Sequence, residues 1–306
     1  MNHITGFTDL CIPQANRAQL EAIIREAIEL GFHNIAIEQE LDLTNSGPSA
    51  NKDDVVPTPY CLQDLKAAFQ GQIRLFNRLT IIFGDALASL VLNRSSNIRS
   101  YDLIAALPTS ESGMTYACQT MHCNIITYRS NTIRLRPNRK FYYLAVDRNI
   151  AFELKYAPAI LSPVERKDTI NCAHRYHSFG KSKNVVISSS AKNPFELRSP
   201  YDIANLGLIF GLSEEQSKEA IRGVPNRILL AAEGRRFGKA GVVITRRPKL
   251  TEDSDDYSDS ELEEDVSGSD ESEDVGSIVQ ALDGKDAEEQ DVEQLKPPKK
   301  KAKHEV

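Results

Sequence analysis

Residues 7–38 read FTDLCIPQANRAQLEAIIREAIELGFHNIAIE. Two short apolar runs, at 7–12 and 34–38, flank a segment whose apolar residues recur at helical spacing. Asn16 followed three residues later by Gln19 is typical of a helix start, and Gly31 is typical of a helix end. The stretch therefore predicts strand, helix and strand, the unit in which a helical crossover joins two parallel strands.

The same alternation continues along the chain. Further strands are predicted at 75–83, 101–107, 124–128, 151–156 and 184–190. Helical patterns lie between them, at 62–69, 85–92, 110–119, 138–150 and from Ser162 onward. The pattern predicts an α/β protein with a TIM-barrel-like fold, that is, an irregularly closed parallel barrel with surrounding helices. A doubly wound open sheet remains the alternative, because periodicity does not show whether a sheet closes.

The pattern changes near the end of this region. Helices are predicted to begin at Ser199, Ser213 and Pro225, and the last of them is predicted to end at Gly234. The run GVVIT at 241–245 is the remaining candidate for an eighth strand, and the sequence leaves open whether it closes the barrel.

The composition divides the 306-residue chain near residue 250. From Thr251 the chain is rich in Asp, Glu and Ser, and such a segment buries too little apolar surface to offset the entropy of ordering. We therefore predict a barrel domain at 1–250 and a disordered tail at 251–306. The first part holds 31 Lys and Arg against 23 Asp and Glu (+8) and the second holds 6 against 20 (−14), which together give the net −6. A basic body suits a partner that carries phosphates.

Simple features of the sequence exclude several classes of protein. The five cysteines have no framework spacing and leave one unpaired, which is typical of reduced thiols. The first residues lack the pattern of a secretory signal, and no stretch approaches the about 18 apolar residues of a membrane span. We expect a soluble intracellular protein without a membrane partner.

Four stretches together carry a resemblance to a known family. They are FTDLCIP (7–13), NRLTII (77–82), VDRNIAFELKYAPAI (146–160) and NVVISSSAKNPFELRSPYDIANLGLIFGL (184–212). The chain resembles the protein subunit of nuclear ribonuclease P and of its relative, MRP ribonuclease. The resemblance implies a TIM-like barrel, a nuclear and nucleolar location, and assembly with other protein subunits around a catalytic RNA.

The family is distantly similar to barrel-fold phosphoesterases that carry a His-x-His metal pair on the first strand, where this chain has Asp9-Leu10-Cys11. A catalytic metal needs several imidazoles or carboxylates that converge on it. None of the six histidines lies at the C-terminal end of a predicted strand, so no catalytic residue and no metal ligand is predicted. His174 and His177 are interpreted as an ordinary exposed or capping pair on a helix, and Cys118 and Cys123 as small buried thiols.

Basic residues gather in three places. The candidates for RNA contacts are Arg129, Arg134, Arg136, Arg139, Lys140, Arg148, Lys181, Lys183, Lys192, Arg198, Arg235 and Arg236. The third group continues with Lys239, Arg246, Arg247 and Lys249. Aromatic residues that can stack on unpaired bases interleave with the first group: Tyr128, Phe141, Tyr142 and Tyr143. The alternative is a solvated basic face with these aromatic residues in the core.

The tail carries two further signals. The stretch KPPKKKAKHEV resembles a nuclear localisation signal through Lys296, Lys299, Lys300, Lys301 and Lys303. Three serines with an acid three residues later are candidates for phosphorylation by acid-directed kinases: Ser258, Ser260 and Ser267.

The sequence leaves two hypotheses for the function of the protein. The favoured hypothesis is a non-catalytic subunit that binds the catalytic RNA and precursor tRNA, packs against other protein subunits, and supports removal of the 5′ leader. It binds no cofactor itself, and magnesium is expected for the catalytic RNA. The alternative is a stand-alone barrel-fold phosphoesterase that depends on a metal.

Overall fold

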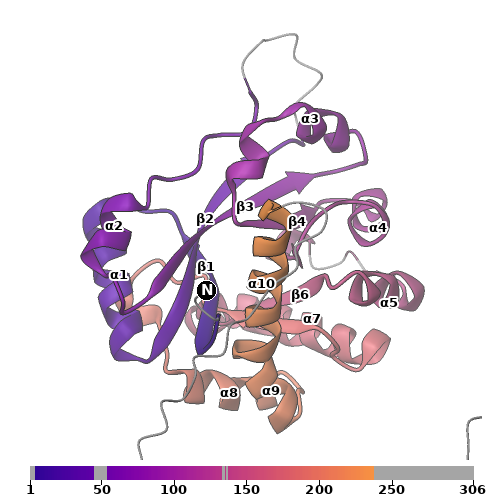
Figure 1. Cartoon of the computed structure of the whole chain (residues 1–306). Helices are drawn as coiled ribbons and strands as arrows, with labels where there is room; N and C mark the ends of the chain where they lie inside the picture. The colour runs from indigo at the N-terminus through magenta and orange to yellow at the C-terminus, as the bar shows by residue number, and fades with distance from the viewer. Residues whose placement is uncertain (1–3, 45–53, 133–134, 136, 238–306) are drawn as a thin grey trace, which may run out of the picture. The chain divides into compact units, whose positions relative to one another are not determined.

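The structure is a computed structural model that describes residues 4–44, 54–132, 135 and 137–237 (Figure 1). Seven strands form one parallel sheet in which each strand pairs with the next, from β1 to β7. The strands are β1 (Phe7–Pro13), β2 (Phe32–Asp42), β3 (Arg74–Phe83), β4 (Leu103–Pro108), β5 (Ile125–Ile126), β6 (Ala151–Lys155) and β7 (Val185–Ser188). The sequential order is that of a barrel and excludes the doubly wound alternative, in which the strand order reverses.

The sheet curls until its first and last strands meet, so the barrel is nearly closed. The amide of Ser190, just beyond β7, donates a hydrogen bond of 2.8 Å to the carbonyl of Cys11 in β1. The predicted fold is thereby confirmed. The possible eighth strand at 241–245, the domain boundary at 250 and the tail lie outside the described residues and stay predictions.

Ten α-helices are found in the described part of the chain. They are α1 (Arg17–Glu29), α2 (Gln63–Ala68), α3 (Ala88–Arg94), α4 (Glu111–Gln119), α5 (Arg139–Asp147), α6 (Tyr156–Leu161), α7 (Pro163–Gly180), α8 (Pro200–Ile209), α9 (Glu214–Ile221) and α10 (Gly223–Phe237). The predicted starts at Asn16, Ser162, Ser199 and Ser213 are confirmed, because each of these side chains caps the helix that follows it. No described helix is long and apolar enough to span a membrane.

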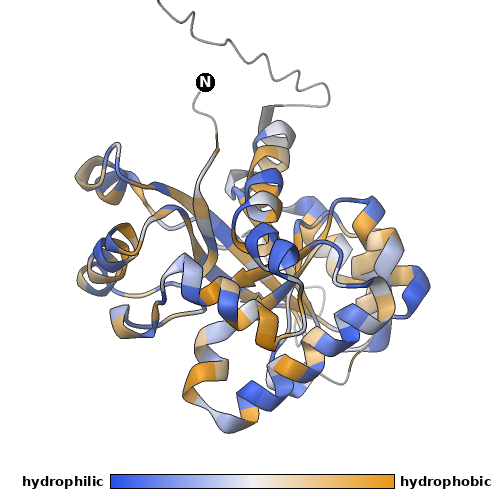
Figure 2. Ribbon diagram, turned by 90° about the horizontal axis from the view of Figure 1, so that it is seen from below, coloured by the Kyte–Doolittle hydropathy of each residue, from blue (hydrophilic) through white to orange (hydrophobic). Residues whose placement is uncertain are grey.

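Alternate residues of each strand point to opposite sides of the barrel wall. Outward side chains such as Ile35, Leu79 and Phe152 join the core under the surrounding helices. Inward side chains form a second cluster that includes Leu10, Phe76 and Val186. Figure 2 shows hydrophobic residues along the strands and hydrophilic residues on the outward sides of the helices.

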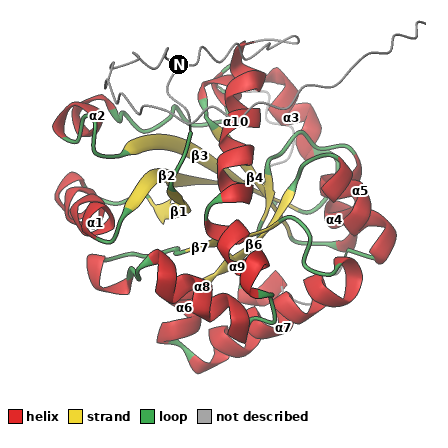
Figure 3. Cartoon of the chain, turned by 60° about the horizontal axis from the view of Figure 1, so that its bottom comes forward, coloured by secondary structure: helices red, strands yellow, loops and turns green. Residues whose placement is uncertain are grey.

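Helix α10 completes the inner cluster from the N-terminal end of the strands, across which it lies in Figure 3. Val224, Ile228, Leu229 and Ala232 pack against the inward residues. The predicted helix boundaries are wrong here, because α10 begins at Gly223 and continues past Gly234. A glycine inside a helix costs only about 1 kcal/mol, and the apolar contacts of α10 outweigh that cost.

Helix α6 was not predicted as a separate element. It contains Pro158, which lies in the first turn, where a missing amide breaks no hydrogen bond of the helix.

Candidate functional site

A buried ion-pair network lies in the middle of the barrel, around the fully buried Arg78 of β3. Its guanidinium donates two hydrogen bonds to the carboxylate of Glu153 in β6, from Nη1 to Oε1 (2.5 Å) and from Nη2 to Oε2 (2.8 Å). Nη2 also lies 3.2 Å from Oε1 of Glu38 in β2. The carbonyl of Leu10 (2.8 Å) and the hydroxyl of Thr80 (3.2 Å) accept the remaining bonds. The guanidinium therefore makes four hydrogen bonds and one further ion pair.

The network stays charged at neutral pH. Burial alone would raise the pKa of Glu153, but the charge of Arg78 and its hydrogen bonds hold that pKa at about 2. Burial likewise opposes ionisation of Glu38, and the charges of Lys155 and Arg78 lower its pKa below the ordinary value. Thr80 and the thiol of Cys11 donate further hydrogen bonds to Glu38, of 2.5 and 3.2 Å. Both carboxylates are thus neutralised by groups of the protein itself.

Sequence reasoning missed this network, although the sequence contains a signal for it. Arg78 and Glu153 each stand inside a strand that is otherwise largely apolar, and Glu38 directly follows the apolar run 35–37 of β2. A charged residue in such a strand can be buried only where it is paired. The sequence could therefore have predicted that these charges are buried in ion pairs, although not which of them meet.

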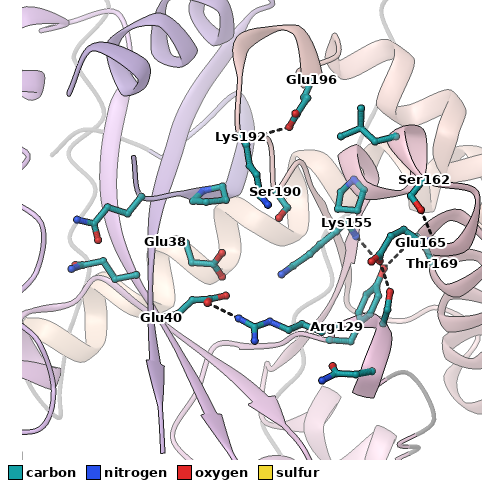
Figure 4. Close-up of a pocket in the computed structure, with 18 residues that line it drawn as sticks. Glu38, Glu40, Arg129, Lys155, Ser162, Glu165, Thr169, Ser190, Lys192 and Glu196 are labelled. Atoms are coloured by element: carbon teal, nitrogen blue, oxygen red, sulfur yellow. Dashed lines mark hydrogen bonds and ion pairs between the residues drawn. The ribbon is translucent and has the colours of Figure 1, made fainter. Parts of the chain in front are cut away.

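A cavity of about 820 Å³ opens at the C-terminal ends of the strands, which we call the barrel mouth (Figure 4). Segments that follow β1, β5, β6 and β7 line it together with the last part of β2. In barrel enzymes this end carries the chemistry. Four acidic and three basic side chains reach its wall: Glu38, Glu40, Glu165, Glu196, Arg129, Lys155 and Lys192.

Asp9, which stands near the position of the phosphoesterase metal pair, belongs to the barrel seam. Its Oδ1 accepts hydrogen bonds of 3.1 Å from the amides of Cys11 and Ser189. Burial raises the pKa of Asp9 to about 6, against the opposing effect of these hydrogen bonds. The side chain therefore joins β1 to the end of β7.

The other candidate ligands are dispersed. His122, His174 and His177 are exposed, and Cys118 and Cys123 are buried thiols, as predicted. Within the described ranges, no three His, Cys, Asp or Glu side chains converge in a way that could hold a metal ion. The absence of catalytic and metal-binding residues stays a prediction.

Three of the basic candidates are engaged within the fold. Arg129 forms an ion pair with Glu40 at the barrel mouth. Arg148 donates to the carbonyls of Cys118 (2.8 Å) and Met121 (2.7 Å), at the end of α4. Arg198 donates to two carbonyls of its own loop, those of residues 195 and 197. Each of the three therefore has part of its hydrogen-bonding capacity used inside the protein.

Five other candidates have exposed side chains: Arg139, Lys140, Lys181, Lys183 and Lys192. The tail residues and the candidates at positions 134, 136, 239, 246, 247 and 249 lie outside the described residues, as do the side chains of Arg235 and Arg236.

The structure brings two of the sequence groups together around one aromatic ring. The guanidinium carbon of Arg139 lies 5.9 Å from the ring centre of Tyr143, and Nζ of Lys183 lies 5.6 Å from it. The predicted stacking role is wrong for Tyr128 and Tyr142, which are buried. The ring of Tyr142 stacks on Phe152 with 4.2 Å between centroids. Tyr143 is partly buried, and its predicted stacking role stays a prediction.

The chain is similar to known proteins of one family. The profile of the family described as "RNase P subunit p30" matches residues 6–237. "Ribonuclease P protein subunit p30" of Mus musculus is 31% identical over 261 residues, which cover 83% of this chain and 96% of the mouse protein. "Ribonuclease P/MRP protein subunit RPP1" of Saccharomyces cerevisiae is 22% identical, over 78% of this chain and 84% of the yeast protein.

A solved structure shares the fold. One chain in the cryo-EM structure of archaeal ribonuclease P with mature tRNA aligns with a TM-score of 0.57 at 16% identity. The alignment covers 78% of this chain and 99% of the archaeal chain. With the family match over nearly the whole barrel and the full-length similarity to the mouse subunit, the chain belongs to the ribonuclease P subunit p30 family.

Proposed function

We propose that this chain is a non-catalytic subunit of ribonuclease P and of MRP ribonuclease, which binds RNA and supports removal of the 5′ leader from precursor tRNA. Membership of the p30 family supports the assignment to the particle. Its partners are then the catalytic RNA, precursor tRNA and other protein subunits. The chain holds no cofactor in this proposal, and the magnesium serves the catalytic RNA.

The observation that carries the non-catalytic role is the paired state of the acids beneath the barrel mouth. Glu153 and Glu38 both pair with Arg78, and the charge of Lys155 also acts on Glu38, so these carboxylates are already engaged by cations of the protein. A metal-dependent phosphoesterase needs carboxylates or imidazoles that face an open coordination position.

RNA binding is supported by the basic surface around Tyr143. Arg139 and Lys183 flank its ring, and Lys140 and Lys181 are exposed on the same two segments of the chain. Guanidinium and ammonium groups bind phosphates, while an aromatic face can stack on an unpaired base. We call these five residues the Tyr143 patch.

Scaffolding is supported by apolar side chains on the segments that line the mouth. Leu161, Val164 and Phe195 are 64, 68 and 91% exposed. Large apolar side chains that gather at one end of a domain are typical of protein–protein contacts. We propose that another protein subunit covers them, and that the particle resides in the nucleus and nucleolus, with import directed by Lys296 and Lys299–Lys303.

Two assays of precursor tRNA cleavage test the proposal. The purified chain alone, with magnesium or manganese, is expected to leave the 5′ leader attached. The same chain, tagged and recovered from nuclear extract, is expected to bring down an RNA and to remove the leader until that RNA is digested. Cleavage by the chain alone that is lost in a stable Glu165→Gln variant would support the phosphoesterase alternative instead.

A further inference from the structure

The barrel mouth has polar features that the proposed function does not use. Its cavity of about 820 Å³ falls in the range of about 300–1,000 Å³ that is typical of small-molecule sites. The wall combines charged groups with amide side chains, among them Gln14, Gln39 and Asn131. A nucleotide-sized polar molecule fits a cavity of this size and composition.

The acidic groups of the mouth are already engaged by the protein. Glu38 takes part in the Arg78 network, and Glu40 forms the ion pair with Arg129. Glu165 accepts a hydrogen bond from the hydroxyl of Ser130. Glu196 accepts one of 2.6 Å from the backbone amide of Lys192.

Unlike these carboxylates, the two lysine amines at the mouth have no bonded partner among the described residues. Lys155, at the end of β6, and Lys192, beyond β7, extend toward the cavity in Figure 4. In the described part of the chain, neither amine has a hydrogen-bond or ion-pair partner within the usual distances. Burial acts to lower the pKa of Lys155, but the surrounding acidic groups, Glu38 and Glu153 among them, raise it above the ordinary value. The partly buried Lys155 therefore keeps its positive charge without a bonded acceptor.

A third positive feature faces the same space. Helix α7, of 18 residues, begins at Pro163, and its N-terminal residues Ser162 and Glu165 line the cavity. The N-terminal end of a helix carries a partial positive charge and favours anions. Two amines without a bonded acceptor in the described ranges and the N-terminus of α7 thus face a space in which each carboxylate already accepts a hydrogen bond or forms an ion pair.

We propose that the barrel mouth binds a 5′-nucleotide, with Lys155 and Lys192 contacting its phosphate monoester and the amide side chains of the wall contacting its base or sugar. A free nucleoside monophosphate and the 5′-terminal nucleotide of an RNA strand present this same chemistry. The site lies within one chain and involves none of the residues of the Tyr143 patch. The proposed nucleotide site can therefore be tested independently of the proposed role of the chain in ribonuclease P.

The test is calorimetric titration of the full-length chain with adenosine 5′-monophosphate, adenosine and inorganic phosphate. The monophosphate is expected to bind at least about tenfold more tightly than adenosine, because the charged phosphate is the main recognised group. Lys155→Met and Lys192→Ala are each expected to weaken its binding about tenfold or more. Lys66→Ala, which removes an exposed lysine of α2, is the matched control and should bind as the unaltered chain does.

Short RNA oligonucleotides then separate the two sources of the ligand. Binding of a 5′-phosphorylated strand, lost in Lys192→Ala, identifies an RNA end, whereas binding of the mononucleotide alone identifies a free nucleotide. Equal binding of strands with a 5′-phosphate and a 5′-hydroxyl would overturn phosphate recognition. So would the absence of saturable binding at millimolar concentrations of every ligand, or unchanged affinity in lysine variants that melt at the temperature of the unaltered chain.

Discussion

The guanidinium of Arg78 and the carboxylate of Glu153 meet side by side through two hydrogen bonds, inside a barrel that shields both completely from solvent. The pair joins β3 to β6, which are separated by two intervening strands in the sheet. A bidentate pair of this kind restricts both distance and orientation. It therefore holds opposite parts of the barrel wall in one arrangement.

Replacing Arg78 with Met should destabilise the fold strongly. The change leaves Glu153 and Glu38 buried without their counterion, and loss of one partner of a buried pair costs about 3–5 kcal/mol. Urea unfolding measures the loss. The double variant Arg78→Met/Glu153→Gln should lose less than the sum of its two single variants, because the second change removes a charge that the first left unpaired. A single variant within about 1 kcal/mol of the unaltered chain would contradict this account.

The raised pKa of Asp9 stabilises the fold at low pH, whereas the lowered pKa of Glu153 stabilises it at higher pH. The pKa of Asp9 is about 6 in the folded protein and 3.8 in its ordinary state, so protonation favours folding. Its contribution is complete only well below the unfolded pKa of 3.8 and is lost as the pH rises through 6. We expect the free energy of unfolding, relative to Asp9→Asn, to fall by roughly 2 kcal/mol between pH 4 and 7. Equal pH profiles for the two proteins would show that the carboxyl does not titrate there.

Two glycines of helices offer a matched pair of substitutions. A Cβ on Gly180, the last residue of α7, would lie 2.0 Å from Cε1 of Tyr142, which is fixed by its stack on Phe152. Gly180→Ala should therefore cost about 1–3 kcal/mol. A Cβ on Gly234 meets nothing within 4 Å, so Gly234→Ala should stabilise α10 by up to about 1 kcal/mol. Thermal unfolding compares the two, and a stabilised Gly180→Ala would count against the tight packing.

The Tyr143 patch makes a prediction about salt dependence. Changing Arg139, Lys140 and Lys183 to Ala should flatten the plot of log affinity against log salt for RNA, by about 0.7–0.9 for each phosphate that is no longer neutralised. Tyr143→Ala should weaken binding without changing the slope, because the ring carries no charge. A triple change of Lys66, Lys167 and Lys218, which are exposed elsewhere, serves as the control. An unchanged slope in the folded first variant would show that the patch is an ordinary solvated face.

The tail should affect location rather than stability. Residues 251–306 carry no apolar stripe that could pack on a domain, so their deletion should leave the melting temperature nearly unchanged. Changing Lys299, Lys300, Lys301 and Lys303 to Ala in the full chain should lower nuclear accumulation, measured by fluorescence of a tagged protein. Full nuclear accumulation of the lysine variant would refute the prediction on import. A melting temperature lowered by many degrees on deletion of the tail would refute the prediction on stability.

The sequence predicts the elements of this protein that are determined by residues close to one another along the chain. The seven strands and the capped starts of α1, α7, α8 and α9 follow from local periodicity and side-chain hydrogen bonds. The Arg78 network joins strands whose charged residues are 40 and 75 positions away from it, and no local pattern shows which inward charges will meet. The Tyr143 patch likewise joins segments about 40 residues apart. Such features depend on how the sheet curls.

Helix α10 has a consequence for the order of events during folding. Asn226 bonds to the hydroxyl of Thr8 (2.8 Å) and the carbonyl of Gly6 (3.0 Å), so the first strand meets its partner more than 200 residues later. Contacts of such high sequence separation slow folding. All seven strands are translated before α10, and until α10 packs, Leu10, Phe76 and Val186 lack their cover. A nascent chain of this protein therefore passes through a stage with an open apolar barrel end, which is a natural binding site for a chaperone.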